Sequence, residues 1–129
     1  MRNALEVVKA FYAAAAAGNG AQMAEQLESD VTWIEMEGTP YGGTYTGPEE
    51  VFSGVFARLV SEWDDFQFTP ERFHDAQDSV AAAGWYTGKF RKTGKALRCR
   101  ALHLWEVSGG KVRRFEQFCD TFVMRRALI

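Results

Sequence analysis

The chain has 129 residues, a length that suits one domain with a single core. Hydrophobic residues make up 47% of the sequence and aromatic residues 14%, so the expected interior is wide and partly filled by rings. The formal net charge of −2 offers no basic surface for nucleic acid, which excludes nucleic acid as an expected partner.

The N-terminal segment contains a run of alanines, but Glu6 and Lys9 interrupt the apolar core that a signal peptide needs. No later stretch is apolar for long enough to span a bilayer. Two cysteines, Cys99 and Cys119, suit a reducing compartment. The sequence therefore predicts a cytoplasmic location and no membrane partner.

Three helices are predicted in the first half of the chain. Asn3 is placed to cap the first, with a glutamate three positions later, and apolar residues then recur at helical spacing as far as Gly18. Asn19 is placed to cap a shorter second helix. The third is predicted to begin at Gly47 and Pro48, because proline suits the first helical position.

A short strand is predicted over residues 31–36, between the second and third helices. Alternation of side chains along a strand puts Trp33 and Glu35 on the same face. A glycine-rich loop over residues 38–47 follows and carries Tyr41 and Tyr45. A loop of this kind can lie over the mouth of a pocket.

The second half of the chain predicts strands from Trp63 onward, with turns over 74–78 and 92–95 and a long strand over 79–91. Residues 122–124 are predicted either to continue the last strand or to form a half-turn. The predicted fold class is therefore α+β, with three N-terminal helices packed on a strongly curved, mainly antiparallel sheet. Such a sheet, wrapped around the first helix, would enclose a pocket.

The last two strands flank Ser108-Gly109-Gly110-Lys111 and form a predicted hairpin. A three-residue loop with Ser108 opposite Val112 sets Trp105 against Phe115. A four-residue loop would lose this aromatic pair. Aromatic and opposite-charge pairs across strands are stabilising, so the three-residue register is predicted.

In this register His103 lies opposite Gln117 among apolar side chains. That arrangement fits a small-molecule pocket, and it equally fits a core with one hydrogen-bonded histidine. On the other face Arg100 lies opposite Asp120. The aspartate is predicted to form an ion pair with this arginine or to cap the end of the strand.

The whole pattern resembles the SnoaL-like polyketide cyclase and ketosteroid isomerase superfamily, as one domain over residues 1–129. The segments TWIEMEGTPYGGTYTGPEEV and LHLWEVSGGKVRRFEQFCDT carry the resemblance. It implies a cone-shaped α+β barrel, the fold of nuclear transport factor 2. It also implies a homodimer through the outer sheet face, where Leu102, Leu104 and Phe118 alternate with charges. The fold hosts isomerases, cyclases, hydrolases, dehydratases and non-catalytic binders, so function must be argued from the site.

The resemblance implies roles for three residues. Cyclases of this superfamily use a histidine on the penultimate strand and an aspartate fourteen positions later, where this chain has His103 and Gln117. Steroid isomerases place a carboxylate base after the first strand, which Glu35 matches, and an oxyanion-binding acid at the position of His103. Their helix tyrosine falls on Phe11, with Tyr12 one residue away and about 100° around the helix.

Two functions are therefore expected. The first is acid–base chemistry, of the isomerase or cyclase type, on a hydrophobic carbonyl-containing small molecule, with Glu35 as base, His103 stabilising or protonating an oxyanion, and Gln117 orienting one of them. The second is a non-catalytic ligand-binding or dimerisation module. No spacing of metal ligands and no phosphate-binding loop occurs, so no cofactor is predicted. The candidate substrate-binding residues are Trp33, Tyr41, Tyr45, Phe56, Trp63, Trp85, Trp105 and Phe115.

Overall fold

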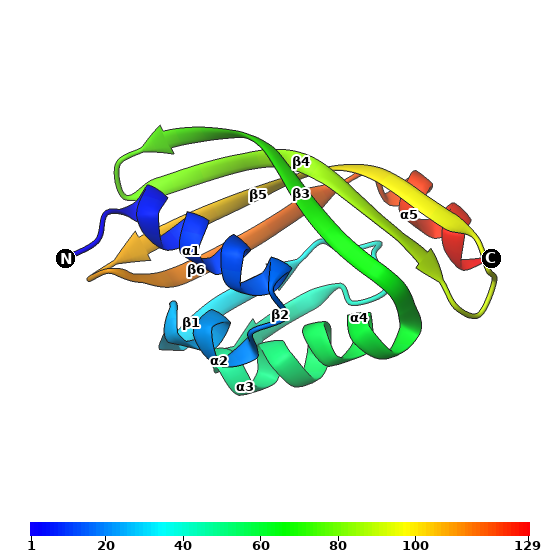
Figure 1. The fold of residues 1–129 in the computed structure, drawn as a ribbon, viewed down its shortest axis with the longest axis horizontal. Helices are drawn as coiled ribbons and strands as arrows, with labels where there is room; N and C mark the ends of the chain where they lie inside the picture. Colours follow the sequence, from blue (N-terminus) through cyan, green and yellow to red (C-terminus); the bar gives the residue numbers. More distant parts are fainter.

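The structure is a computed structural model that describes residues 1–129. Figure 1 shows a long curled sheet with helices on its inner side. The helices are α1 (Ala4–Ala16), α2 (Gly20–Glu25), α3 (Gly47–Val51), the π-helical turn η1 (Phe52–Phe56), α4 (Ala57–Glu62) and α5 (Thr121–Leu128). The strands are β1 (Leu27–Glu35), β2 (Gly43–Thr46), β3 (Trp63–Ala76), β4 (Ser79–Phe90), β5 (Ala96–Ser108) and β6 (Lys111–Cys119).

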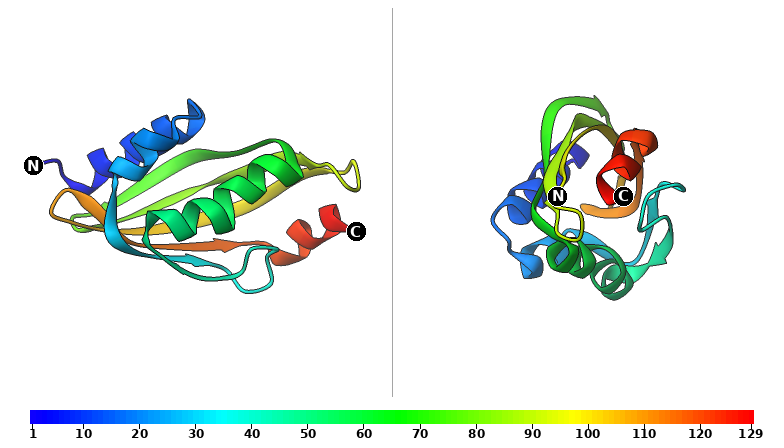
Figure 2. Two further views of the ribbon diagram at one scale, coloured as in Figure 1. Left: turned by 90° about the horizontal axis from the view of Figure 1, so that it is seen from below. Right: turned by 90° about the vertical axis from the view of Figure 1, so that its right-hand side faces the viewer.

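The six strands form one sheet in the order β2-β1-β6-β5-β4-β3, in which only the β1–β6 pair is parallel. The end-on view in Figure 2 shows the sheet curling around the molecular axis, with the α3–α4 helical segment on its open side. The sheet does not close, because β2 and β3 remain its edges. The α+β prediction of helices on a curved, mainly antiparallel sheet is confirmed.

The first two helices begin where their caps predict. The Asn3 side chain accepts a hydrogen bond from Glu6 N at 2.9 Å, and Asn3 N donates to Glu6 Oε1 at 3.1 Å, which completes a capping box. Gly18 follows α1 with a φ of +67°. Asn19 then caps α2 by accepting from Gln22 N at 3.0 Å.

The hairpin between β5 and β6 has the predicted register outward from Glu106. The pairs are Glu106–Arg114, Trp105–Phe115, His103–Gln117 and Ala101–Cys119. At the tip, Ser108 pairs with Lys111 and not with Val112, so the loop has two residues, both glycines. Their φ angles of 60° and 77° match a type I′ turn. A bulge beyond Glu106 then restores the predicted pairing.

The C-terminal segment differs from the prediction. Residues 121–128 form helix α5, and Asp120 caps it by accepting from Val123 N at 3.1 Å. Asp120 therefore caps the start of a helix, whereas the predicted cap was at the end of the strand. The ion pair with Arg100 is absent, since that guanidinium lies 3.3 Å from Glu71 on β3. The strand ends at Cys119 because the aspartate starts a helix in its place.

Two other boundaries also shift, and the third helix contains an unexpected turn. β1 begins at Leu27, four residues earlier than expected, where it pairs in parallel with Val112. β3 runs to Ala76, so the turn into β4 holds only Gln77 and Asp78. The third helix starts as predicted near Pro48 but contains the π-helical turn η1. Such turns widen a helix locally and are frequent at functional sites.

Candidate functional site

A cavity of about 1070 Å³ lies between the concave face of the sheet and the helices. Its lining is predominantly apolar and includes residues from α1, the α3–α4 segment and strands β1, β3, β4, β5 and β6. The exposed residues of the lining belong to the end of α1, the start of α2, the α3–α4 segment, the start of β3 and the residue that follows β4. These elements surround the mouth, and the deeper wall belongs to the sheet.

Glu35 stands at the end of β1 and is only 6% exposed. Its Oε2 accepts a hydrogen bond from Trp33 Nε1 at 2.9 Å, while Oε1 has no protein partner. Burial raises the pKa of Glu35 from its ordinary value of 4.5 to about 7, and the Trp33 hydrogen bond opposes this rise. The carboxyl group can therefore take up and release a proton near neutral pH.

His103 projects from β5 into the same cavity and is held by two phenols. Its Nδ1 lies 2.7 Å from the Tyr12 hydroxyl, and its Nε2 lies 2.6 Å from the Tyr86 hydroxyl. Phe68 stacks on the imidazole with a centroid distance of 3.9 Å. Burial lowers the pKa of His103 to about 3, so the imidazole is neutral at physiological pH. One ring nitrogen then donates a hydrogen and the other accepts one.

Gln117 and Trp105 each donate a hydrogen bond to one of the two phenols. The Gln117 Oε1 atom accepts from Met36 N at 3.0 Å, which directs Nε2 to donate to the Tyr86 hydroxyl at 2.9 Å. Trp105 Nε1 donates to the Tyr12 hydroxyl at 2.9 Å. The five residues of this continuous hydrogen-bonded set, here called the His103 network, are Trp105, Tyr12, His103, Tyr86 and Gln117.

Both phenols of the network stay protonated. Burial raises the pKa of Tyr12 far above its ordinary value, and the Trp105 hydrogen bond only partly offsets the rise. Burial also raises the pKa of Tyr86, and the nearby Glu35 carboxylate adds to this effect. The network therefore contains neutral hydrogen-bond donors next to a titratable carboxyl group.

The structure brings most of the predicted residues to one place. Glu35, His103 and Gln117 all line the cavity. So do six of the eight predicted substrate-binding aromatic residues, namely Trp33, Tyr41, Phe56, Trp63, Trp105 and Phe115. Trp33 and Phe115 stack with a centroid distance of 3.8 Å and form a continuous aromatic surface beside the carboxyl group.

Trp85 lies on the other side of the sheet, which corrects the prediction that it lines the pocket. Its Nε1 donates to Glu71 Oε2 at 3.1 Å, and the Arg98 guanidinium stands 3.7 Å from its ring. The reason is the alternation of side chains along β4. Tyr86, the next residue, points inward, so Trp85 must point outward.

Tyr45 is also absent from the cavity lining. Its hydroxyl donates to the Tyr41 carbonyl oxygen at 2.6 Å, and its ring fills the space that a side chain at Gly54 would need. Tyr41 in turn donates to Glu62 Oε1 at 2.8 Å and accepts from Trp63 Nε1 at 3.0 Å. The two tyrosines thus have different roles, since Tyr45 supports the loop and Tyr41 faces the cavity.

Sequence reasoning missed Tyr12 and Tyr86 as site residues. Tyr12 was expected to point away from the position of Phe11, yet both line the cavity, because α1 crosses its side and a wide part of the helix surface faces inward. Tyr86 belongs to the buried set of β4, together with Val80 and Ala82. Both alternating sets of this strand are mostly small or apolar in the sequence, so its pairing with β5 is what turns Tyr86 inward.

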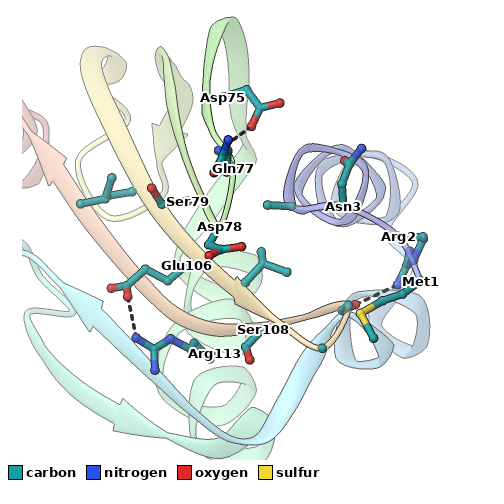
Figure 3. A pocket seen from close by; sticks show the side chains of 15 residues that line it. Met1, Arg2, Asn3, Asp75, Gln77, Asp78, Ser79, Glu106, Ser108 and Arg113 are labelled. Atoms are coloured by element: carbon teal, nitrogen blue, oxygen red, sulfur yellow. Dashed lines mark hydrogen bonds and ion pairs between the residues drawn. The ribbon is translucent and has the colours of Figure 1, made fainter.

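A second hollow, of about 950 Å³, lies between the start of α1 and the tips of the β3–β4 and β5–β6 turns (Figure 3). Its wall is polar, and Figure 3 shows Arg113 turned toward Glu106, which it meets at 2.9 Å. Asp75 is likewise engaged, since its Oδ1 accepts from Gln77 N at 3.1 Å. The hollow shares no residue with the apolar cavity, which is the candidate site.

The curled sheet, the helices on its open side and the enclosed apolar cavity define a nuclear transport factor 2-like protein. The chain belongs to the SnoaL-like family, because the model of the SnoaL-like domain matches residues 8–115. No curated protein matches the sequence.

Solved structures agree with this assignment. An NTF2-like protein from Burkholderia thailandensis is 40% identical, with coverage of 100% of this chain and 99% of that chain and a TM-score of 0.97. A hypothetical protein with a ketosteroid isomerase-like fold from Catenulispora acidiphila, in complex with trimethylamine, is 20% identical, with coverage of 95% and 91% and a TM-score of 0.81. A putative SnoaL-like polyketide cyclase from Shewanella denitrificans is 12% identical, with coverage of 96% and 95% and a TM-score of 0.78. The last two show likeness of fold alone.

None of the helices has both the length and the apolar character needed to cross a membrane. No group of three or more His, Cys, Asp or Glu side chains is arranged to hold a metal ion.

Proposed function

We propose that this SnoaL-like protein is an enzyme that moves a proton on a hydrophobic carbonyl-containing small molecule, by chemistry of the isomerase or cyclase type. One observation carries the proposal. A carboxyl group with a raised pKa, Glu35, lines the same apolar cavity as the hydrogen-bonding network around His103. A base and a set of donors in one apolar cavity are what proton abstraction next to a carbonyl requires.

Glu35 is the proposed base. Its Oε1 has no protein partner, so this oxygen is free to reach a carbon-bound proton of the ligand. The pKa of about 7 leaves a substantial fraction ionised at neutral pH, while the protonated form is acidic enough to give the proton back. The carboxylate takes a proton from the carbon next to the carbonyl, which leaves an enolate. The carboxyl group then returns the proton to another carbon of the conjugated system, so the step is balanced without a further reactant.

The proposed role of the His103 network is to stabilise the enolate oxygen. Negative charge develops on that oxygen during the reaction, and donors already held in place stabilise it without reorganisation. The protein holds the imidazole through contacts of 2.6 and 2.7 Å. The Gln117 amide cannot exchange protons as a carboxyl group does, so Gln117 is not a second base. It supports the same role by donating a hydrogen bond to the Tyr86 hydroxyl.

The aromatic walls support a hydrophobic substrate. Trp33, Phe115 and Trp105 are each at most 2% exposed, and their rings face the cavity next to Glu35. They exclude water from the carboxyl group, which strengthens every electrostatic interaction inside. The volume of about 1070 Å³ is slightly larger than the usual range for small-molecule sites, about 300 to 1000 Å³.

The alternative is a non-catalytic protein that binds an apolar ligand in the same cavity. It is favoured by Gln117 and Phe11, which stand where cyclases and steroid isomerases of the superfamily have ionisable or phenolic groups. Ligand binding would then need the cavity but not the base.

Deuterium exchange separates the two functions. Cyclic β,γ-unsaturated ketones of increasing ring number would be incubated with the protein in deuterium oxide. Catalysis by Glu35 predicts deuterium next to the carbonyl and a shift of the double bond into conjugation, both lost in Glu35→Gln. If the wild type binds a ketone but exchange is no faster than in buffer, the enzyme proposal is overturned and the binding module is favoured.

We also propose that the protein is a cytoplasmic homodimer. Leu102, Leu104 and Phe118 share the outer face of β5 and β6, and each is 37% exposed. Such an apolar strip on a sheet suits a self-complementary contact between two copies. Sedimentation of the purified protein tests the dimer, and imaging of a fluorescent fusion tests the location.

A further inference from the structure

We infer that the His103 network always presents one phenol hydrogen to the cavity, from Tyr12 or from Tyr86, and that a ligand oxygen without a hydrogen of its own accepts it. The inference deepens the proposed function and rests on the cavity being a ligand site. It assigns ligand contact to the two phenols and makes His103 a positioning residue.

The number of hydrogens in the network leads to this result. Tyr12, His103 and Tyr86 together carry three polar hydrogens when the imidazole is neutral. Only two contacts join them, Tyr12 to Nδ1 and Nε2 to Tyr86, and each contact uses one hydrogen. One hydrogen is therefore left over.

The two ends of the network cannot accept the remaining hydrogen. At one end Trp105 Nε1 is a donor only, and it already donates to the Tyr12 hydroxyl. At the other end Gln117 donates through Nε2, while its Oε1 accepts from Met36 N. No other protein acceptor meets either hydroxyl, and both tyrosines line the cavity.

Two arrangements of the hydrogens satisfy every contact. When Tyr12 donates to Nδ1, the Nε2 hydrogen goes to the Tyr86 oxygen and the free hydrogen belongs to Tyr86. When Tyr86 donates to Nε2, the Nδ1 hydrogen goes to the Tyr12 oxygen and the free hydrogen belongs to Tyr12. In both arrangements the two ring nitrogens of His103 are occupied, so the imidazole itself has no hydrogen for a ligand.

The single free phenol hydrogen determines which ligand oxygen fits beside it. A ketone, aldehyde or quinone-type carbonyl accepts a hydrogen without bringing one, and it satisfies the free phenol. An alcohol at the same position brings a further hydrogen, and the phenol that donates to it has an oxygen that already accepts from two N–H groups. The network therefore selects a carbonyl, or the oxyanion that forms from it, over the corresponding alcohol.

Acetophenone labelled with ¹³C at the carbonyl is the test ligand, with ethylbenzene as the probe that lacks the oxygen. Binding is followed by quenching of tryptophan fluorescence, and the hydrogen bond by the infrared stretching frequency of the labelled carbonyl. In the wild-type protein the frequency should fall below its value in an apolar solvent. In the triple variant Tyr12→Phe/Tyr86→Phe/His103→Leu, which also removes the imidazole N–H that loss of the phenols would free, it should return to that value, and acetophenone should bind about five- to tenfold more weakly while ethylbenzene is unaffected.

The control variant is Tyr45→Phe, which removes a phenol outside the cavity lining and should leave the carbonyl frequency unchanged. A lowered frequency that persists in the triple variant would overturn the inference, because a donor outside the His103 network, such as Glu35, would then hold the carbonyl. A wild-type protein that binds acetophenone without lowering the frequency would overturn it as well. Failure of both probes to bind would overturn the cavity as a ligand site and the inference with it.

A second measurement uses the wild-type protein only, so it does not depend on how the variants fold. Nitrogen NMR of ¹⁵N-histidine should show one protonated and one unprotonated ring nitrogen in His103 at neutral pH. An imidazolium signal would overturn the inference, because both nitrogens would then donate. If the wild-type protein lowers the carbonyl frequency but catalyses no deuterium exchange, the proposed catalysis is refuted and the phenol contact still stands.

Discussion

The Nε2 atom of His103 lies 2.6 Å from the hydroxyl of Tyr86, and both residues are at most 5% exposed. The two side chains come from neighbouring strands, β5 and β4, in a register that pairs His103 with Ala82 and Tyr86 with Cys99. The small Ala82 side chain leaves room for the ring above it. The contact therefore depends on strand pairing as much as on the two residues that make it.

Replacing Glu35 with glutamine should stabilise the fold at alkaline pH. The pKa of Glu35 is raised in the folded state from 4.5 to about 7, so the unfolded chain binds fewer protons between these values and stability falls as pH rises through them. Ionising the buried carboxyl group costs about 3 kcal/mol over that interval. The advantage of Glu35→Gln, measured by denaturant unfolding, should approach this value above pH 7 and disappear near pH 4. An advantage independent of pH would contradict the raised pKa.

The rate of deuterium exchange into a bound ketone should rise with pH and level off above about 7. The reason is that only the ionised form of Glu35 accepts a proton, and burial places its pKa there. The rate is measured by mass spectrometry at saturating ketone across the pH range. Glu35→Asp serves as the matched variant, because it keeps the carboxyl group but withdraws it by one methylene. A profile that levels off near the ordinary value of 4.5 would show that another group, or a solvated carboxylate, is the base.

Gln117→Leu should destabilise the fold by about 1 to 3 kcal/mol, since it removes the acceptor of a part-buried N–H and one of the two partners of a buried hydroxyl. The N–H belongs to Met36 and the hydroxyl to Tyr86. Thermal and denaturant unfolding measure the loss. Gln67→Leu, on the exposed part of β3, is the control and should change stability far less. Equal losses in the two variants would argue against the hydrogen bonds of Gln117.

Gly84→Ala should disturb the site through packing. A Cβ atom at Gly84 would stand 2.3 Å from the Thr69 carbonyl oxygen and 2.7 Å from the Phe68 ring, which stacks on His103. The strands must separate locally, so lower stability and a change in the ring signals of His103 are expected, and both can be measured by unfolding and NMR. Ala81→Ser, on the same strand at a half-buried position, is the comparison. An unchanged His103 spectrum would show that Phe68 does not fix the imidazole.

Phe118→Lys should convert the proposed dimer to a monomer. The side chain is 37% exposed on the outer face of β6, where it lies opposite Leu102. Two added charges facing each other across a two-fold contact would repel and would lose the buried apolar area. Analytical ultracentrifugation gives the mass of wild type and variant. Lys111→Glu, at the hairpin tip, is the control, and a wild-type protein that is already monomeric would refute the dimer.

Several features follow from the sequence because they depend on near neighbours. The caps at Asn3 and Asn19 need only the next three residues, and the shared face of Trp33 and Glu35 needs only the alternation of a strand. The pairing of His103 with Gln117 follows from the charges and aromatic residues of one hairpin. These local rules also suffice for the α+β class, because helices that precede a meander of strands leave few other ways to form a core.

The tertiary structure alone decided how the site is assembled. Tyr12 and Tyr86 meet His103 from 91 and 17 residues away, through the position of α1 and the register of β4 on β5. The sequence offered Trp85 and Tyr86 as neighbours, and only strand pairing determined which of them faces inward. Side-chain alternation is a local rule, but its phase in one strand is set by the neighbouring strand. For that reason the sequence could indicate an imidazole and a carboxylate in the pocket, and only the folded chain shows the two phenols between which the imidazole is held.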